Sequence, residues 1–339
     1  MGKSPPVDPA GMNETIQKGG CPMDINCKEA AAFLKASDDI LILCHRNPDG
    51  DTLGSGCGLC RALRCMGKRA RILVSDPIPR KMQYLAEGCS GDFEPQTIVS
   101  TDIADEQLFG DALEPYRGRV QLAIDHHPSN SRFAERLLLD PGAAATTELV
   151  FAVIRELGVP LTCEIADCLY TGLATDTGCF AYSNTTPQTH RIAADLIEAG
   201  CRYKELNKLL FETKSLSVMA AEREALNSLE MHFNGRAALI LISRDMLTRT
   251  GVTESELDGI AAIPRKIEGV EIGITVKERG DREYKISIRT GEQIDACRLC
   301  QNFGGGGHTR AAGCTIEGSL DEVKALILGA AGRTLEENP

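Results

Sequence analysis

The sequence predicts an α/β protein with two domains, and three observations lead to this fold class. Short apolar runs such as Ile40–Cys44 and Val120–Ile124 have the length and composition of parallel strands that are buried on both faces. Between about residues 25 and 200 such runs alternate with helical patterns, which predicts a largely parallel sheet with helices on both faces. The length of 339 residues suits two domains of ordinary size.

The first expected strand, Ile40–Cys44, leads directly into a loop. Pro48 and Gly50 disfavour a regular helix immediately after the strand and favour a tight turn. The apolar stretch at 168–174 reads either as a strand or as a buried helix. The other elements expected in this domain are a helix at about 52–66 and strands at 96–99 and 120–124.

The rest of the chain is expected to form a smaller, mixed α/β domain. Helical patterns without a strand-like run extend from about residue 191 to 229, which predicts a helical linker at 201–216. Residues 1–22 are rich in glycine, proline and polar side chains, which predicts a disordered tail rather than a secretory signal. The domains are expected at 23–200 and 217–335, with strands of the second at 237–242, 270–276 and 284–288.

Three side chains of the kind that bind metals follow the first strand. His45, Asp49 and Asp51 lie within the seven residues from 45 to 51, in the loop before the next helix. A plainer interpretation is a strand-to-helix turn in which Asp49 or Asp51 caps the helix. The interpretation as metal ligands gains weight because similar residues follow other apolar runs.

Histidine and aspartate recur at the ends of these other runs. The strand at 120–124 is followed by Asp125-His126-His127, the strand at 96–99 leads to Asp102, and the stretch at 168–174 ends near Asp176. Because the carboxyl ends of parallel strands meet at one edge of an open sheet, these side chains are expected to lie together. Crowded carboxylates and imidazoles would repel one another unless cations lay between them. Two divalent metal ions are therefore predicted, and such sites catalyse phosphoryl chemistry.

Charge and composition restrict the partners. The net charge of −11 favours short substrates over long nucleic acid, which usually requires a basic face. No apolar run approaches the length of a membrane span, so a cytoplasmic protein without a membrane partner is expected. The cysteines are expected to be reduced thiols. The pairs Cys57/Cys60 and Cys297/Cys300 fall in apparent helices, where packing is favoured over a zinc or redox role.

These motifs resemble the four motifs of the DHH phosphoesterase superfamily. The matching residues are His45-x-x-x-Asp49-x-Asp51, Asp102 in Asp-Ile-Ala-Asp-Glu-Gln-Leu-Phe-Gly, Asp125-His126-His127 and Asp176. The segment Phe303-Gly-Gly-Gly-Gly-His308-Thr-Arg-Ala-Ala-Gly313 resembles the signature of the DHHA1 domain, and the stretches 175–187 and Ile263-Pro-Arg-Lys-Ile-Glu-Gly269 add to the likeness. The similarity runs from about residue 25 to 330 and is specific for the small two-domain members, the oligoribonuclease (nanoRNase) and pAp phosphatase group.

The resemblance implies how the two metal ions are held. Mn²⁺ is favoured because carboxylates mixed with imidazoles suit it better than Mg²⁺, which remains the alternative. Asp102 is implied to bridge the ions, and His127 to contact a phosphate oxygen and stabilise the transition state, so both are candidate catalytic residues. One ion is implied on His45 and Asp49, and the other on Asp51, His126 and Asp176.

The second domain is implied to hold the part of the substrate that is not cleaved, with the active site in the cleft between the domains. The glycine run offers backbone N–H groups to an anion, although a flexible hairpin is the plainer interpretation of glycines alone. Arg289, at the end of an expected strand, suits phosphate, with a solvated strand end as its alternative. A helix or a turn is expected after the run. The candidate substrate-binding residues are Gly304, Gly305, Gly306, Gly307, His308 and Arg289.

The implied activity is metal-dependent exonuclease cleavage of oligoribonucleotides a few nucleotides long, including linear dinucleotides such as pApA and pGpG, to mononucleotides. A phosphatase activity on 3′-phosphoadenosine 5′-phosphate (pAp) is implied as a second function, and the resemblance allows a homodimer. Another small phosphoester hydrolase on the same core is one alternative. A catalytically idle nucleotide-binding regulator is another, but the presence of every motif ligand argues against it.

Overall fold

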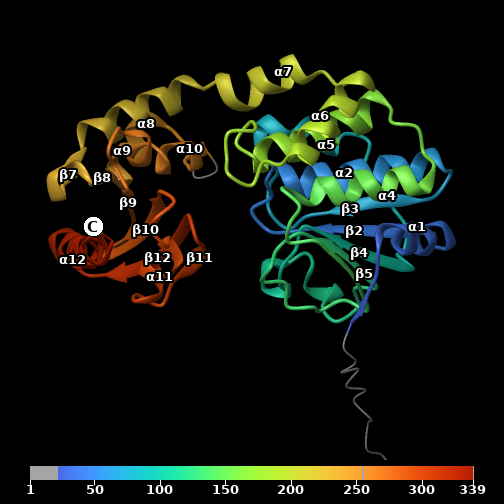
Figure 1. Ribbon diagram of the computed structural model, residues 1–339, viewed down its shortest axis with the longest axis horizontal. Helices are drawn as coiled ribbons and strands as arrows, with labels where there is room; N and C mark the ends of the chain where they lie inside the picture. Colours follow the sequence, from blue (N-terminus) through green and yellow to red (C-terminus); the bar gives the residue numbers. More distant parts are fainter. Residues whose placement is uncertain (1–21, 254–255, 339) are drawn as a thin grey trace, which may run out of the picture. The chain divides into compact units, whose positions relative to one another are not determined.

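The computed structural model describes residues 22–253 and 256–338. The chain forms two compact units, the first ending at Phe211 and the second beginning at Glu212 (Figure 1). Residues 1–21, which make up most of the predicted tail, lie outside the described residues. Within the described ranges, no helix combines the length and the apolar character that a membrane crossing requires.

The first unit is built on a six-stranded sheet in which all paired strands are parallel. The strand order is β1-β6-β5-β4-β2-β3. The chain runs from β2 to β3 on one side and returns to β4 on the other, and open α/β sheets bind ligands at such a reversal. The strands are β1 (Met23–Asp24), β2 (Ile40–Cys44), β3 (Ala70–Leu73), β4 (Thr97–Thr101), β5 (Leu122–Asp125) and β6 (Arg136–Leu139).

Helices cover both faces of this sheet, as predicted, but the two faces differ in kind. Helices α1 (Cys27–Ala36), α2 (Gly50–Cys65) and α4 (Thr146–Leu157) pack on one face, and α5 (Cys163–Asp176) packs on α2 and α4 (Figure 1). The other face is covered by a segment with two 3-10 helices, η2 (Glu106–Leu108) and η3 (Glu114–Tyr116). Further helices are η1 (Arg80–Met82), α3 (Gln83–Ala86), α6 (Pro187–Glu198), α7 (Tyr203–Asn207) and the π-helix Lys208–Glu212.

Small residues bring α2 against α5. A Cβ atom on Gly54 would lie 2.4 Å from the carbonyl oxygen of Cys168, so only glycine permits this approach. The stretch 168–174, for which the sequence allowed a strand or a buried helix, is part of helix α5. Asp176 is the last residue of α5, and it reaches the site from a helix end rather than from a strand.

The second unit is built on a mixed sheet with the order β11-β12-β10-β9-β8-β7. Strands β8 and β9 are parallel, and the other neighbouring strands are antiparallel. The strand expected at 237–242 coincides with β8, whereas those expected at 270–276 and 284–288 are longer in the structure. The strands are β7 (Glu230–His232), β8 (Ala237–Ile242), β9 (Ile272–Gly280), β10 (Glu283–Thr290), β11 (Gly306–His308) and β12 (Ala311–Glu317).

Strand β10 separates the core of this unit from an open face. Ile286 and Ile288 are buried against the C-terminal helix α12 (Leu320–Glu337), while Lys285, Ser287 and Arg289 alternate with them and point the other way. The remaining helices described in this unit are α8 (Leu216–Asn227), η5 (Phe233–Gly235), α9 (Arg244–Thr250), α10 (Asp258–Ala261), η7 (Pro264–Lys266) and α11 (Ala296–Gln301).

Candidate metal centre and anion pocket

The first group of predicted ligands lies at the ends of β2 and β4. His45 follows β2 directly, and its Nε2 lies 3.6 Å from Oδ1 of Asp49 and 3.5 Å from Oδ2 of Asp102. Asp49 also caps α2, because its side chain accepts hydrogen bonds from the N–H groups of Asp51 and Thr52. Asp49 therefore caps helix α2 and also belongs to the cluster of potential metal ligands.

The second group surrounds His126, which follows β5. Its Nε2 lies 3.5 Å from Oδ2 of Asp176, 3.7 Å from Oδ1 of Asp102 and 4.0 Å from Oδ2 of Asp51. Its other ring nitrogen, Nδ1, is 3.1 Å from the carbonyl oxygen of Ala143. In a neutral histidine, an Nδ1 that donates to a carbonyl leaves Nε2 unprotonated, and this is the form that binds a metal.

Asp102 links the two groups. Among the described residues, three sets of potential ligand atoms lie within 4.8 Å of one another: His45 with Asp49 and Asp102, Asp51 with His126 and Asp176, and Asp102 with His126 and His127. Asp102 follows β4 in a left-handed backbone conformation, with φ of 61°. The structure thus brings together all six residues that the sequence nominates as metal ligands, and one of the three sets also includes His127.

The N-terminus of α4 supports this cluster in a way that sequence reasoning missed. Oδ2 and Oδ1 of the buried Asp51 accept hydrogen bonds from the backbone N–H groups of Thr146 (2.6 Å) and Thr147 (3.0 Å). The hydroxyl of Thr146 donates to Oδ1 of Asp102 at 2.9 Å. The only signal in the sequence is a threonine pair at the start of a helical pattern, and nothing local connects Thr146 to Asp51 and Asp102, which lie 95 and 44 positions away.

The electrostatics of the cluster favour cations. Burial and the neighbouring carboxylates of Asp102 and Asp176 raise the pKa of Asp51 well above its usual value. Burial and the carboxylates of Asp102 and Asp49 raise the pKa of Asp176 to about 8. Burial lowers the pKa of His45, but Asp102 and Asp49 outweigh it and raise that pKa to about 11. The raised pKa values of these carboxylates and of the imidazole show that the cluster has an excess of negative charge, which protons would compensate. Bound metal cations can compensate the same charge in place of the protons.

The donor set therefore fits divalent metal ions. Carboxylate oxygens and imidazole nitrogens are ligands for Mn²⁺, and also for Zn²⁺ or Fe²⁺, whereas sites built for Mg²⁺ usually contain oxygen alone. Asp102 shares one set with His45 and Asp49, and it lies 3.7 Å from His126, which also belongs to the set with Asp51 and Asp176. One carboxylate therefore lies between two groups of ligands, as in a site for two ions.

His127 lies beside the cluster with its own support. Its Nδ1 is 2.7 Å from Oδ1 of Asp125, and Nδ2 of Asn130 donates to Oδ2 of Asp125 at 2.6 Å. Burial lowers the pKa of His127, but the hydrogen bond with Asp125 and nearby carboxylates raise it to about 9. The sequence placed Asp125 in a motif without giving it a role, and it carried no signal for Asn130.

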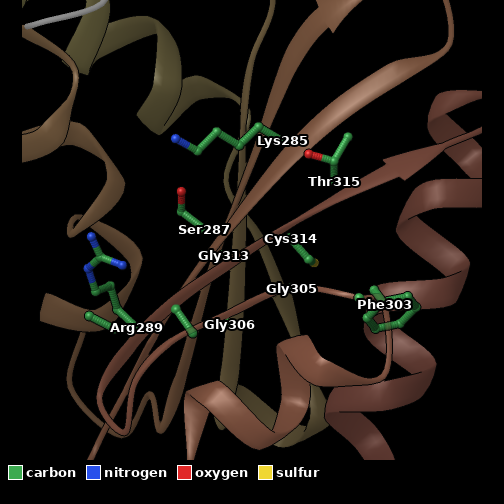
Figure 2. Close-up of a pocket in the computed structure, with 12 residues that line it drawn as sticks. Lys285, Ser287, Arg289, Phe303, Gly305, Gly306, Gly313, Cys314 and Thr315 are labelled. Carbon is green, nitrogen blue, oxygen red and sulfur yellow. The ribbon is translucent and has the colours of Figure 1, made fainter. Parts of the chain in front are cut away.

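The second unit contains a pocket of about 680 Å³, within the size range of ligand sites (Figure 2). Lys285, Ser287 and Arg289 of β10 line it from one side, and Figure 2 shows their side chains pointing the same way. Gly304, Gly305 and Gly306 also line it. The structure thus places four of the six nominated substrate-binding residues around one pocket.

The other two nominated residues are Gly307 and His308. Gly307 is not among the residues that line the pocket, because a Cβ there would point at Ala311 and Ala312 of the neighbouring strand. The backbone of His308 ends β11, and its side chain lies outside what the structure describes. Of the helix or turn expected after the glycine run, the structure has the turn, which joins β11 to β12.

The cysteine pairs lie in helices, as predicted. Cys57 and Cys60 are in α2, and Cys297 and Cys300 are in α11. All cysteines in the described part of the chain are free thiols. None of them joins a group of metal-type ligands there.

Comparison with known proteins agrees with this geometry. Residues 39–173 match the model of the DHH family, N-terminal domain, and residues 238–336 match that of the DHHA1 domain. The bifunctional oligoribonuclease and PAP phosphatase NrnA of Thermus thermophilus is 36% identical over 309 residues, which cover 88% of this chain and 91% of that protein. The chain belongs to the DHH family.

Two further proteins are similar to this chain over most of its length. The bifunctional oligoribonuclease and PAP phosphatase NrnA of Bacillus subtilis is 30% identical over 297 residues, which cover 86% of this chain and 93% of that protein. The crystal structure of an exopolyphosphatase-related protein from Bacteroides fragilis is 24% identical, covers 92% of this chain and 95% of its own, and has a TM-score of 0.83. The similarity to this last structure shows a shared fold.

Proposed function

We propose that this DHH protein is a metal-dependent phosphodiesterase that degrades short oligoribonucleotides, including linear dinucleotides such as pApA and pGpG, to mononucleotides. The observation that carries the proposal is the group of three ligand sets, linked through Asp102 and His126, at the carboxyl edge of the parallel sheet. The relatives named as oligoribonucleases and PAP phosphatases support the same substrate class and suggest pAp as a second substrate.

We assign the metal ligands by these sets. His45 and Asp49 would hold one ion, Asp51, His126 and Asp176 the other, and Asp102 would contact both. When bound, two ions, with Mn²⁺ favoured and Mg²⁺ the alternative, would supply a nucleophile from water at neutral pH and stabilise charge on the phosphoryl group. The hydrogen bonds from Thr146 and Thr147 hold Asp51 in place, and the hydroxyl of Thr146 orients Asp102.

His127 would act on the substrate. Because Asp125 engages Nδ1, a contact with a phosphate oxygen would use Nε2. The hydrogen bond with Asp125 raises the pKa of His127 and so favours the protonated ring, which could donate a hydrogen bond to charge that develops on the phosphoryl oxygens. The orientation of the ring depends on the link from Asn130 through Asp125.

The second unit would hold the nucleotide that is not cleaved. Its pocket offers the guanidinium of Arg289 and the ammonium of Lys285 on one side and the backbone of Gly304–Gly306 on another. Cations together with exposed backbone N–H groups suit an anion such as a nucleotide phosphate. The free thiols of the described chain support a reducing compartment such as the cytoplasm.

The test is release of mononucleotide from a dinucleotide. Purified protein, stripped of metal and then supplied with Mn²⁺, should convert pApA to AMP, and the metal-free protein should not. Short RNA labelled at the 5′ end or at the 3′ end would give the direction of attack, and release of phosphate from pAp would test the second activity. Tight binding of pApA without any release under Mn²⁺ or Mg²⁺ would instead identify a nucleotide-binding regulator.

A further inference from the structure

We propose that Asn184 is a positioning residue for the metal centre, which ties the backbone segment beside His126 to the end of helix α5 that carries Asp176. The inference rests on the proposed function, because it concerns two ligands that are assigned to the same ion. Asn184 lies in the turn between α5 and α6 and is not itself among the potential metal ligands.

The side-chain amide of Asn184 bridges two carbonyl groups. Its Nδ2 donates to the carbonyl oxygen of Ala144 at 3.0 Å and to that of Asp176 at 3.1 Å. A side-chain amide has two N–H donors, so Asn184 can make both bonds at once. Ala144 and Asn184 are 40 residues apart, so the amide joins segments that are distant in the chain.

The segment at one end of this bridge supports three of the ligands. The carbonyl oxygen of Ala143, the residue before the bridged alanine, lies 3.1 Å from Nδ1 of His126. Thr146 of the same segment donates its backbone N–H to Asp51 and its hydroxyl to Asp102. A contact that fixes this segment therefore fixes the partners of all three ligands.

The segment at the other end begins with Asp176, the last residue of α5. Carbonyl groups at a helix C-terminus lack partners within the helix, and Asn184 donates to this one. The turn between the two residues contains three successive left-handed residues, Gly178, Cys179 and Phe180, with φ of 56°, 57° and 66°. Two of them are not glycine, and such a strained turn persists only where surrounding contacts hold it. The bonds of Asn184 are contacts of this kind.

Asp176 depends on its backbone more than the other carboxylates near His126 do. Asp51 and Asp102 accept hydrogen bonds from the start of α4, and their side chains are 1% and 3% exposed. The carboxylate of Asp176 is 31% exposed, and no hydrogen bond from another described residue reaches it. Its place beside His126 is therefore set by the end of α5, which Asn184 links to the segment that supports His126.

The test is a calorimetric titration of metal-free protein with Mn²⁺ in the absence of substrate. Wild-type protein should bind two ions. Asn184→Leu keeps the size of the side chain and removes both donors. It should bind one ion about 10- to 100-fold more weakly, the usual loss when a partner of a metal ligand is removed, and change the other less. Asn184→Gln keeps the amide on a longer side chain and should weaken the same ion by less.

The matched control is Thr185→Val. Thr185 is the next residue of the same turn, and its buried hydroxyl has no hydrogen-bond partner among the described residues. Valine has nearly the same shape, so both Mn²⁺ affinities should match those of the wild type. A loss in Thr185→Val as large as that in Asn184→Leu would show that any change in this turn disturbs the metal centre, and the role of the Asn184 amide would be wrong.

A double variant separates positioning from general support of the fold. His126→Ala removes a ligand of one ion and should leave the ion on His45 and Asp49. Adding Asn184→Leu should change the affinity for this remaining ion little, because the ligands that Asn184 positions no longer bind a metal. A loss at the remaining ion as large as the loss in the single Asn184→Leu variant would mean that Asn184 supports the whole unit, and its positioning role would be refuted.

The same titration distinguishes failure of this inference from failure of the proposed function. If wild-type protein binds two ions and Asn184→Leu binds both with wild-type affinity, Asn184 has no positioning role and the proposed function stands. Equal losses at both ions in Asn184→Leu would lead to the same conclusion. Wild-type protein that binds no Mn²⁺ would overturn the metal centre, and the proposed function would fail together with the role of Asn184.

Discussion

Nδ1 of His127 lies 2.7 Å from Oδ1 of Asp125, whereas Nδ1 of the adjacent His126 faces the carbonyl oxygen of Ala143. The two neighbouring rings therefore have different surroundings. The carbonyl turns Nε2 of His126 toward the carboxylates of Asp102 and Asp176. A carboxylate instead supports a proton on His127, which suits a donor to phosphate.

This difference predicts opposite effects of two alanine substitutions. His126→Ala should lose metal, because a ligand is removed. His127→Ala should keep its metal content while kcat falls by about 10²- to 10³-fold, the loss typical of one transition-state donor. Metal analysis of the purified variants, followed by turnover of pApA, measures both. Loss of metal from His127→Ala with retention in His126→Ala would reverse the two roles.

Asp102→Asn should abolish nearly all activity. Asparagine fits the left-handed backbone at this position, so the fold is kept, but the side chain can no longer bridge two cations by its charge. Thr146→Val, which removes a hydrogen bond to Asp102, should be milder, with about 10- to 100-fold weaker metal binding. Titration with Mn²⁺ under turnover compares them. An Asp102→Asn protein that retains its metal and is no worse than Thr146→Val would exclude the bridge.

Arg289→Ala should separate substrate holding from chemistry. Its kcat/KM on pApA should fall by about 10- to 150-fold through the lost charged contact. Bis-p-nitrophenyl phosphate carries no nucleotide to hold, so its hydrolysis should change little. The ratio of the two rate constants in wild type and variant is the measurement. Equal losses on both substrates would place Arg289 in the chemical step or in the stability of the unit.

Two adjacent glycines in the pocket should respond differently to alanine. A Cβ on Gly305 would lie 2.3 Å from the carbonyl oxygen of Gly313, whereas a Cβ on Gly306 meets nothing within 4 Å. Gly305→Ala should therefore destabilise the protein by about 1–3 kcal/mol, the usual cost of overpacking. Gly306→Ala should keep wild-type stability and weaken only nucleotide binding, because its methyl group enters the pocket. Urea unfolding and kcat/KM on pApA test both, and equal stability of the variants would contradict this geometry.

Activity should decline with substrate length. A pocket of about 680 Å³ accommodates little more than one nucleotide beyond the cleaved one. The net charge of −11 opposes a longer polyanion. Rates on a trinucleotide should exceed those on a 24-nucleotide RNA, and the salt dependence of kcat/KM should be shallow because few phosphates are contacted. Equal rates on the two RNAs, or a steep salt dependence, would refute this expectation.

Local sequence patterns were sufficient to predict part of the structure of this protein. The apolar run Ile40–Cys44 and the ligands that follow it could be recognised because a buried parallel strand and its loop are encoded by adjacent residues. The α/β class followed from alternation of strands and helices, and the family could be recognised from four motifs of fixed spacing. The residues nominated as metal ligands could be recognised as candidates for the same reason, since they follow apolar runs closely in the sequence.

Other features were set only by contacts between distant segments. The stretch 168–174 had the composition of a strand or a helix, and close packing of α5 on Gly54 of α2 accompanies its helical form. The backbone N–H groups of Thr146 and Thr147 reach Asp51 across some 95 residues, so no local pattern records them. Arg265 of η7 lies against Gly273 and Gly291, and only the folded sheet brings these segments into contact. The sequence by itself therefore determined the fold class, the family and the candidate site residues, and the tertiary structure decided which of these residues touch and what supports them.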